Sequence, residues 1–431
     1  KTVSSQGVER TRSTRGVEID FKKLATGNVV RCHHISLMKS LKQHGDDAVQ
    51  AMDEEIMQMI NKEVWEPVVY SSIPQALRKS IIRCSIFCKE KFAPSGEFQK
   101  LKMRLVAGGD NQDRSLYVEE EISSPTVSLS AVYAIAAIAA NERRHVATLD
   151  VPGAFLNTKI MKPVYMVISG PIAERLVLLD QKYADYRQSS GVIYVRLIKA
   201  LYGCIESANL WYKFLSDKLI KDLGFTVNGK DNCVFNKNTQ DGQITIALYV
   251  DDLLLTCKDE KLIKSTIDVL QVSFPEKLTV HNGPIISYLG QTLDFTIPGK
   301  VTLSMSRYIQ ELLEVTSTTG VSTVPAGADL FCTSTDSAVL SGDKRNLYAT
   351  IVAKILFLAT RVRPDLLLTI SYLTTRSNGN LPTESDWHKL SKCLRYLNAT
   401  KDLQLVMNCS NGLNVKAYVD ASFGTHADMR G

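Results

Sequence analysis

Two adjacent acidic residues, Asp251 and Asp252, stand between two apolar runs, residues 243–249 and 253–257, that have the composition of β-strands. Neighbouring carboxylates repel each other, and burying them is costly unless a cation compensates their charge. An Asp-Asp pair at the tip of a hairpin therefore predicts a divalent metal site. The alternative is that the two residues only form a tight turn, where aspartate is common.

Asp150 is the candidate for a third carboxylate. It ends a short apolar run at residues 145–150 and precedes a Pro152-Gly153 turn, so its side chain would emerge beside the hairpin if the strands are neighbours. Two Mg²⁺ ions held about 3.5 to 4 Å apart by such carboxylates would activate an attacking hydroxyl and stabilise the leaving oxygen of an in-line displacement. The predicted chemistry is phosphoryl transfer.

A basic segment lies ahead of these acids. Residues 77–104 hold eight basic and two acidic residues, a net charge of +6, which equals the formal charge of the whole chain. The segment is typical of two strands around a turn at residues 93–96, which predicts a basic hairpin suited to phosphates. The alternative is an ordinary solvated face. The basic residues are Arg78, Lys79, Arg83, Lys89, Lys91, Lys100, Lys102 and Arg104.

The elements that must position these residues are helices and strands mixed along the chain, which indicates an α+β fold. With 431 residues, 45% hydrophobic and 22% charged, the chain can bury several cores, and this composition excludes intrinsic disorder. The amphipathic helix predicted at 46–64 is stopped by Pro67. Other helices are predicted at 127–140, 210–223, 258–272, 348–360, 364–376 and 384–398, and strands at 145–150, 243–249, 253–257, 288–295, 300–304 and 413–420.

Several classes of protein are excluded by composition. No stretch reaches the roughly 20 mostly apolar residues of a spanning helix, and residues 1–16 lack the apolar core of a secretory signal. The nine cysteines are odd in number and scattered, which favours reduced thiols inside the cell over a disulfide framework or a zinc site. A first residue of Lys rather than Met is typical of a fragment or a processed product.

Four sequence blocks, in the same order, resemble the reverse transcriptases of copia-type long-terminal-repeat retrotransposons. They are KMRLVA at 102–107, TLDVPGAFL at 148–156, KALYG at 199–203 followed by Trp211-Tyr212, and LYVDD at 248–252. The gap of 101 residues between Asp150 and Asp251 also suits the palm domain of this family. Weaker likeness runs from Trp65 to Leu397, so the resemblance covers the chain from about residue 46 to its end.

The resemblance implies a right-hand polymerase of fingers, palm and thumb with an antiparallel palm sheet, as part of a Pol polyprotein. The expected ranges are a polar tail at 1–45, the polymerase at 46–315, a linker at 316–341, a helical connection region at 342–412, and a truncated start of a ribonuclease H-like domain at 413–431. Asp420 would be the first metal carboxylate of that last domain. Since its further acids are not in this sequence, no ribonuclease H activity is expected from this chain alone.

The activity implied by the resemblance is RNA-directed DNA synthesis, in which a primer is extended with deoxynucleotides on an RNA or DNA template. Asp150 and Asp251 would be the principal ligands of two Mg²⁺ ions, for which Mn²⁺ can substitute. Asp252 would be the third carboxylate, and the Val151 carbonyl would add a further oxygen. Lys277 falls where the family has a lysine able to protonate the pyrophosphate leaving group, although a solvated surface lysine is an equal alternative.

The resemblance also places residues around the incoming nucleotide. Arg104 and Lys102 would bind its triphosphate, the arginine as a fork and the lysine as a point charge. Phe155 would be the aromatic steric gate beneath the sugar, which favours deoxynucleotides. Tyr202 and Gly203 would line the nucleotide pocket. The alternatives are ordinary solvated bases for the first pair and a core side chain for Phe155.

Two departures from the family pattern leave a second hypothesis open. The family reads LYGLKQ and then Pro, whereas residues 201–208 read LYGCIESA, with Ile205 and Glu206 at the basic and amide positions; Gly108-Gly109-Asp110 also lacks a basic residue. An added acid near a nucleic-acid track is expected to weaken phosphate contacts. The alternative is therefore a catalytically silent or domesticated nucleic-acid-binding remnant. A two-metal phosphatase or nuclease on another fold would need further ligands near the Asp pair, and none is found.

The expected partners follow from the same reasoning. Binding of a primed template should depend strongly on salt and weakly on sequence, because backbone charge, shape and stacking carry most of the contact. No membrane partner is expected. The resemblance implies integrase from the same polyprotein as a further partner, and a cytoplasmic location within virus-like particles.

Overall fold

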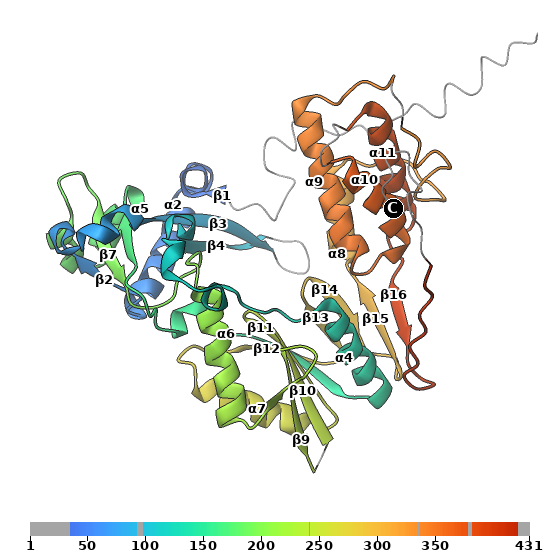
Figure 1. The fold of residues 1–431 in the computed structure, drawn as a ribbon, viewed down its shortest axis with the longest axis horizontal. Coiled ribbons are helices and arrows are strands. Elements are labelled where there is room, and N and C mark those ends of the chain that lie inside the picture. The colour runs from blue at the N-terminus through green and yellow to red at the C-terminus, as the bar shows by residue number, and fades with distance from the viewer. Residues whose placement is uncertain (1–34, 93–97, 241, 334–335, 378–381, 421–431) are drawn as a thin grey trace, which may run out of the picture. The chain divides into compact units, whose positions relative to one another are not determined.

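The computed structural model describes residues 35–92, 98–240, 242–333, 336–377 and 382–420 (Figure 1). They divide into two compact units. The first, here called the site unit, consists of Arg31–Ile135 and His145–Gly283. The second, here called the C-terminal unit, consists of Ala136–Arg144 and Pro284–Gly431. The predicted domain boundaries at 315 and 341 stay predictions.

The site unit begins with a sheet of strand order β1-β3-β6-β7-β2, in which β4 adds to β3. The pair β3 and β6 is parallel, and the other pairs are antiparallel. Strands β3 and β4 are the two arms of the predicted basic hairpin, whose turn lies outside the described residues. The strands are β1 (Ile35–Ser36), β2 (Trp65–Val68), β3 (Ile82–Phe92), β4 (Phe98–Ala107), β6 (Tyr165–Ile168) and β7 (Ile193–Leu197).

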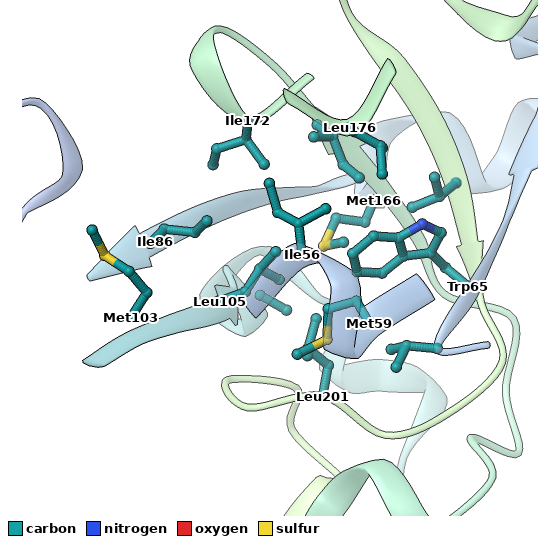
Figure 2. Packing of buried hydrophobic residues seen from close by; sticks show 14 of the residues in the cluster. Ile56, Met59, Trp65, Ile86, Met103, Leu105, Met166, Ile172, Leu176 and Leu201 are labelled. Atoms are coloured by element: carbon teal, nitrogen blue, oxygen red, sulfur yellow. The ribbon is translucent and has the colours of Figure 1, made fainter. Parts of the chain in front are cut away.

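Helices α2 (Leu37–Asn61) and α5 (Pro171–Leu179) pack on this sheet and close an apolar core. Figure 2 shows Ile56 and Met59 of α2 among side chains of the strands, with Trp65 beside them. The indole of Trp65 donates a hydrogen bond to the Tyr183 hydroxyl at 3.1 Å. The one polar atom of this large ring is therefore satisfied inside the core.

Helix α2 differs from its prediction at both ends. It begins at Leu37, crosses a kink at Gly45 with φ of 50°, and ends at Asn61. Pro67 therefore does not stop it. That proline lies in β2, opposite Val195 of β7, and β2 is the edge strand of its sheet, where a residue without an N–H group is tolerated.

A second sheet of the site unit has the order β12-β5-β11-β10-β9-β8, and all its pairs are antiparallel. Its central strand β11 buries Leu253, Leu254 and Leu255 completely, which explains the uninterrupted apolar run in the sequence. Helix α7 packs against β11. The strands are β5 (His145–Asp150), β8 (Thr226–Val227), β9 (Val234–Thr239), β10 (Gly242–Tyr249), β11 (Asp252–Cys257) and β12 (Thr279–Asn282); the helices are α3 (Glu119–Ile122), α6 (Ser207–Asp217) and α7 (Glu260–Val272). Helix α4 (Leu129–Glu142) runs from the site unit into the C-terminal unit.

The C-terminal unit combines the antiparallel sheet β13-β14-β15-β16 with helices that follow β15 and with the end of α4. The strand predicted at 288–295 is instead a hairpin, because Leu289 and Gly290 both have positive φ and form a two-residue turn. The strands are β13 (Ile285–Tyr288), β14 (Gln291–Asp294), β15 (Lys300–Ser304) and β16 (Leu405–Asn408); the helices are α8 (Ser306–Val315), α9 (Gly342–Ala359), α10 (Leu367–Thr375) and α11 (Glu384–Ala399).

The prediction of a strand at 413–420 is wrong. These residues are exposed and have no β-partner in the described part of the chain; Val415, Tyr418 and Val419 are more than nine-tenths exposed. A single unpaired strand is not stable in water, so the alternating sequence alone does not suffice. Asp420 lies at the end of this segment.

A buried arginine joins two helical segments of the C-terminal unit. Arg363 is fully buried and forms a two-pronged contact with the Asp365 carboxylate, at 2.7 and 3.0 Å. It also donates to the Thr400 carbonyl at 2.9 Å, and the Tyr396 hydroxyl donates to Asp365 at 3.0 Å. These contacts fix the end of α11 to the turn before α10.

Among the described helices, none is long and apolar enough to cross a bilayer.

Candidate active site

The three predicted aspartates lie at one end of the second sheet. Asp150 is the last residue of β5 and Asp252 the first of β11, and the two residues are directly paired. On the other side of β5, Thr279 of β12 lies opposite Asp150. Tyr249 pairs with Asp252, so the β10–β11 hairpin has a two-residue loop of Val250 and Asp251. The structure thus brings Asp150, Asp251 and Asp252 together.

The hairpin loop is held from two directions. The Val250 carbonyl accepts a hydrogen bond from the Trp211 indole at 2.6 Å, and the Asp251 carbonyl accepts one from the Val151 N–H at 3.3 Å. Val250 has φ of 56°, a left-handed conformation that is unfavourable for a β-branched residue. The position of Asp251 therefore depends on contacts with segments that are distant in the sequence.

The electrostatics of the aspartates reflect their crowding. Burial raises the pKa of Asp252 to about 6, and repulsion by Asp251 and Asp150 contributes to the rise. The pKa of Asp251 is also raised, first by burial and then by Asp150, while its own backbone N–H and the cations Arg104 and Lys102 oppose the shift. A divalent cation beside these carboxylates would relieve the repulsion.

The donor set fits Mg²⁺ when the substrate completes it. In the described residues, no three carboxylate, imidazole or thiolate groups are arranged as a ready-made metal cage. Mg²⁺ commonly takes one or two carboxylates and fills its shell with water and substrate phosphates. Asp150 and Asp252 at the ends of two adjacent strands, with Asp251 and the Val151 carbonyl in the segments beside them, offer oxygen atoms of that kind.

Three predicted nucleotide-binding residues form one stack. The Arg104 guanidinium of β4 lies 4.3 Å from the centre of the Tyr202 ring, and that ring lies 4.5 Å from the Phe155 ring. Burial raises the pKa of Tyr202 to about 12, with the charge of Asp251 as the next cause, so the stack lies close to the aspartates. Phe155 is 8% exposed, in the turn Ala154–Asn157. Burial to this degree agrees with either predicted role of Phe155, the steric gate beneath the sugar or a side chain of the core.

Gly203 and Gly109 allow two loops to approach very closely. Gly203 has φ of 94°, and a Cβ there would lie 2.0 Å from the Ala107 carbonyl oxygen. A Cβ on Gly109 would lie 1.9 Å from the Gly203 oxygen, and the Ala107 N–H donates to the Tyr202 carbonyl at 2.7 Å. These contacts fix the Tyr202 loop to the end of β4. Sequence reasoning missed Gly109, although the Gly-Gly pair at the end of a predicted strand signals such an approach.

The two lysines predicted to act at the site, Lys102 and Lys277, are both exposed. Lys102 is exposed on β4, two residues from Arg104. Lys277 is exposed two residues before Thr279, and no hydrogen bond or ion pair joins it to the aspartates among the described residues. The structure does not bring Lys277 into contact with them.

Neighbours of these lysines were missed by sequence reasoning. Beside Lys277, Glu276 forms an ion pair with Lys62 at 3.1 Å and accepts from Gln58 at 3.3 Å, which ties this segment to the end of α2. Near Lys102, the Glu55 carboxylate accepts from the Leu105 N–H at 2.7 Å. A cavity of about 520 Å³ is lined by Glu55, Gln58, Lys62 and Glu276 together with Lys102. Their signal was weak, because acids on an amphipathic helix normally face water.

Glu206 is buried, so direct contact with a phosphate is not expected of it. Only 4% of this residue is exposed. Its carboxylate accepts from the Tyr117 hydroxyl at 2.9 Å and from the Gln112 amide at 3.1 Å, while the Gln112 oxygen accepts from the Ile205 N–H at 2.7 Å. The acid is therefore part of a buried hydrogen-bond network that joins the loop after β4 to the loop before α6.

Restoring the amide of the family at this position should destabilise the protein. In Glu206→Gln the single oxygen can serve Gln112 or Tyr117 but not both, and Gln112 cannot turn because Ile205 holds its oxygen. We expect a loss of about 1 kcal/mol in the free energy of unfolding, measured in urea, and unchanged binding of primed template. Glu119→Gln, at an exposed position of α3, is the control. Tighter binding by Glu206→Gln would contradict this account.

Comparison with known proteins assigns the chain that carries these paired aspartates to a family. Residues 62–327 match the model of the family described as reverse transcriptase (RNA-dependent DNA polymerase), so the chain belongs to the reverse transcriptase family. Within it, the relatives place the chain in the Pol reverse transcriptase region of copia-type retrotransposons.

Two relatives illustrate the match. The chain is 30% identical over 382 residues to the retrovirus-related Pol polyprotein from transposon RE2 of Arabidopsis thaliana, covering 88% of this chain and 24% of that protein. It is 27% identical over 396 residues to the corresponding polyprotein from transposon TNT 1-94 of Nicotiana tabacum, covering 89% and 27%. The chain thus spans about a quarter of the length of these relatives.

Among solved structures, a foamy viral protease-reverse transcriptase in complex with double-stranded DNA matches 81% of this chain and 48% of its own. The TM-score is 0.41 and the sequence identity 13%. The family assignment rests on the sequence matches and not on this likeness.

Proposed function

We propose that this chain is an RNA-directed DNA polymerase that extends a primer with deoxynucleotides on an RNA or DNA template, in the replication of a retrotransposon. The observation that carries the proposal is the direct pairing of Asp150 with Asp252 on neighbouring strands, with Asp251 in the adjoining loop. The stack of Arg104, Tyr202 and Phe155 beside them supplies a cation and a flat aromatic surface for a nucleotide.

Each residue then has a role in phosphoryl transfer. Asp150 and Asp251 would hold two Mg²⁺ ions, or Mn²⁺ in their place, with Asp252 as the third carboxylate and the Val151 carbonyl as a further oxygen. The bound ions would activate the primer hydroxyl and stabilise the leaving pyrophosphate. Lys277 would supply a proton to the pyrophosphate.

Around the substrate, Arg104 and Lys102 would bind the triphosphate. Arg104 is oriented for this by the Tyr202 ring, since a guanidinium above an aromatic face is held there by cation–π attraction. Phe155 supports the other side of Tyr202 and would restrict the space at the sugar. Gly203 would let the pocket close onto the end of β4.

The wider assignments are part of the same proposal. The sheet of β1–β4, β6 and β7 would form the fingers, the sheet of β5 and β8–β12 the palm, and residues 284–315 the thumb, followed by the connection region. The chain would act in the cytoplasm within virus-like particles, bind a primed template and dNTPs, and meet integrase of the same polyprotein. Ribonuclease H activity is not expected of this chain alone.

The test is primer extension on poly(rA) primed with oligo(dT), with Mg²⁺, comparing the wild type with Asp251→Asn. Incorporation of dTMP by the wild type alone supports the proposal. If both proteins bind the primed template and neither extends it, the catalytically silent remnant becomes the better description. The burial of Glu206 speaks against direct repulsion of phosphates by this acid, which was one ground for that alternative.

A further inference from the structure

The loop that carries Asp251 is strained and depends on an outside contact. Val250 occupies the first position of a two-residue hairpin loop with φ of 56°, where glycine is the usual residue because it alone adopts this conformation without cost. A β-branched residue persists there only when its surroundings hold it. The sequence does not offer the glycine, so another group must stabilise the loop.

That group is the indole of Trp211. The ring is fully buried on α6, and its N–H donates to the Val250 carbonyl at 2.6 Å. The Phe214 and Phe274 rings lie 5.8 and 5.9 Å from it and fix its orientation. Because this carbonyl belongs to the peptide unit between Val250 and Asp251, the bond sets the backbone angles on both sides of that unit.

The peptide unit on the other side of Asp251 is held as well. Its carbonyl accepts from the N–H of Val151, the residue after Asp150. The backbone of Asp251 is thus fixed by α6 on one side and by the end of β5 on the other. Phe274 lies five residues before Thr279, the residue of β12 that is opposite Asp150. The contact between the Trp211 and Phe274 rings therefore also ties Trp211 to the segment that leads into β12.

We propose that Trp211 is a positioning residue of the catalytic loop, which holds the Val250–Asp251 peptide unit so that Asp251 and Asp150 can share their metal ions. The inference rests on the proposed function. It identifies a residue outside the metal ligands and the nucleotide pocket. Without the indole N–H, the loop should relax toward conformations with negative φ at Val250, and the Asp251 carboxylate should leave its place beside Asp150.

The experiment compares Trp211→Phe, which keeps a buried aromatic ring but removes the donor, with Tyr212→Phe. The control removes a hydrogen bond of similar length, 2.9 Å, from the next residue of α6 to the Asn232 carbonyl. Hydrogen exchange of a peptide covering residues 246–254, Mn²⁺ binding followed by electron paramagnetic resonance, and primer extension as a function of Mg²⁺ are measured on all variants.

Trp211→Phe should speed exchange in the loop, weaken Mn²⁺ binding and raise the Mg²⁺ requirement, each by about tenfold, because the half-buried Val250 carbonyl loses its partner. Tyr212→Phe should change none of these. Adding Val250→Gly to Trp211→Phe should recover most of the loss, since glycine adopts positive φ freely; a merely structural tryptophan would not be rescued there.

The inference is overturned if Trp211→Phe matches Tyr212→Phe in exchange and Mn²⁺ binding, or if Val250→Gly restores neither. Exchange and Mn²⁺ binding do not require catalysis. A wild type that does not extend primers would therefore count against the proposed function, while these two measurements would still decide the role of Trp211.

Discussion

Asparagine in place of Asp251 should slow primer extension by about a thousandfold or more and, at the same time, make the metal-free protein more stable at pH 7.5. The first effect follows because a neutral amide is a poor ligand for Mg²⁺, and because the charge developed in phosphoryl transfer then lacks its compensation. The second follows because Asp251 repels Asp252, whose pKa is about 6.

The pH dependence has a definite sign. The pKa of folded Asp252 lies above its ordinary value of 3.8, so the stability tied to this group is fully present below pH 4 and is lost as the pH rises through about 6. Burial, the main cause of the raised pKa of Asp252, remains in Asp251→Asn, so relief of the repulsion should return only about 1 kcal/mol at pH 7.5 after allowance for solvent screening.

Urea denaturation in EDTA at pH 5 and 7.5 checks this second effect, with Asp222→Asn, in an exposed ion pair with Lys218, as the control. Mg²⁺ should stabilise the wild type and have little effect on Asp251→Asn. A wild type that gains no stability at pH 5, together with a less stable variant at pH 7.5, would show that the two carboxylates do not interact as described.

Alanine in place of Gly203 should destabilise the site unit by about 3–5 kcal/mol. The added Cβ would lie 2.0 Å from the Ala107 carbonyl oxygen, which is backbone and cannot swing aside, and alanine at φ of 94° is strained as well. Because the same loop carries Tyr202, separation of the loops should also displace Tyr202 from Arg104 and lower activity even where the protein stays folded.

The matched control is Gly229→Ala, because nothing lies within 4 Å of a Cβ at that position and its φ is not positive. It should cost less than about 0.5 kcal/mol. The free energies of unfolding of both variants are measured in urea at 25 °C. Equal stability of the two variants would mean that the loops do not approach as closely as described.

Local sequence patterns predicted the elements near the aspartates well. Strand β5 begins and ends where predicted, and β10 and β11 each begin one residue earlier than predicted, since their apolar residues are bounded by turn residues. Patterns failed where pairing between distant segments decides, as with Pro67 on an edge strand and with residues 413–420, which have no partner in the described chain.

The candidate site, too, could be predicted from the sequence only in part. That Asp150 would emerge beside the Asp-Asp hairpin could be stated from the sequence only on the condition that the strands are neighbours. The burial of Glu206 and the bond from Trp211 to Val250 depend on contacts across 94 and 39 residues. No periodicity encodes such contacts, because they arise only when the loops and α6 pack together.

The carboxylate of Glu55 has a consequence for association between molecules. Strand β4 pairs with β3 on one side, and within the described residues no strand pairs with its outer edge. Such an edge can recruit a strand from another chain and start aggregation. Glu55 occupies the Leu105 N–H on that strand, and Lys100 and Lys102 are exposed along it. These features disfavour edge-to-edge pairing of the hairpin with the same hairpin of a second copy.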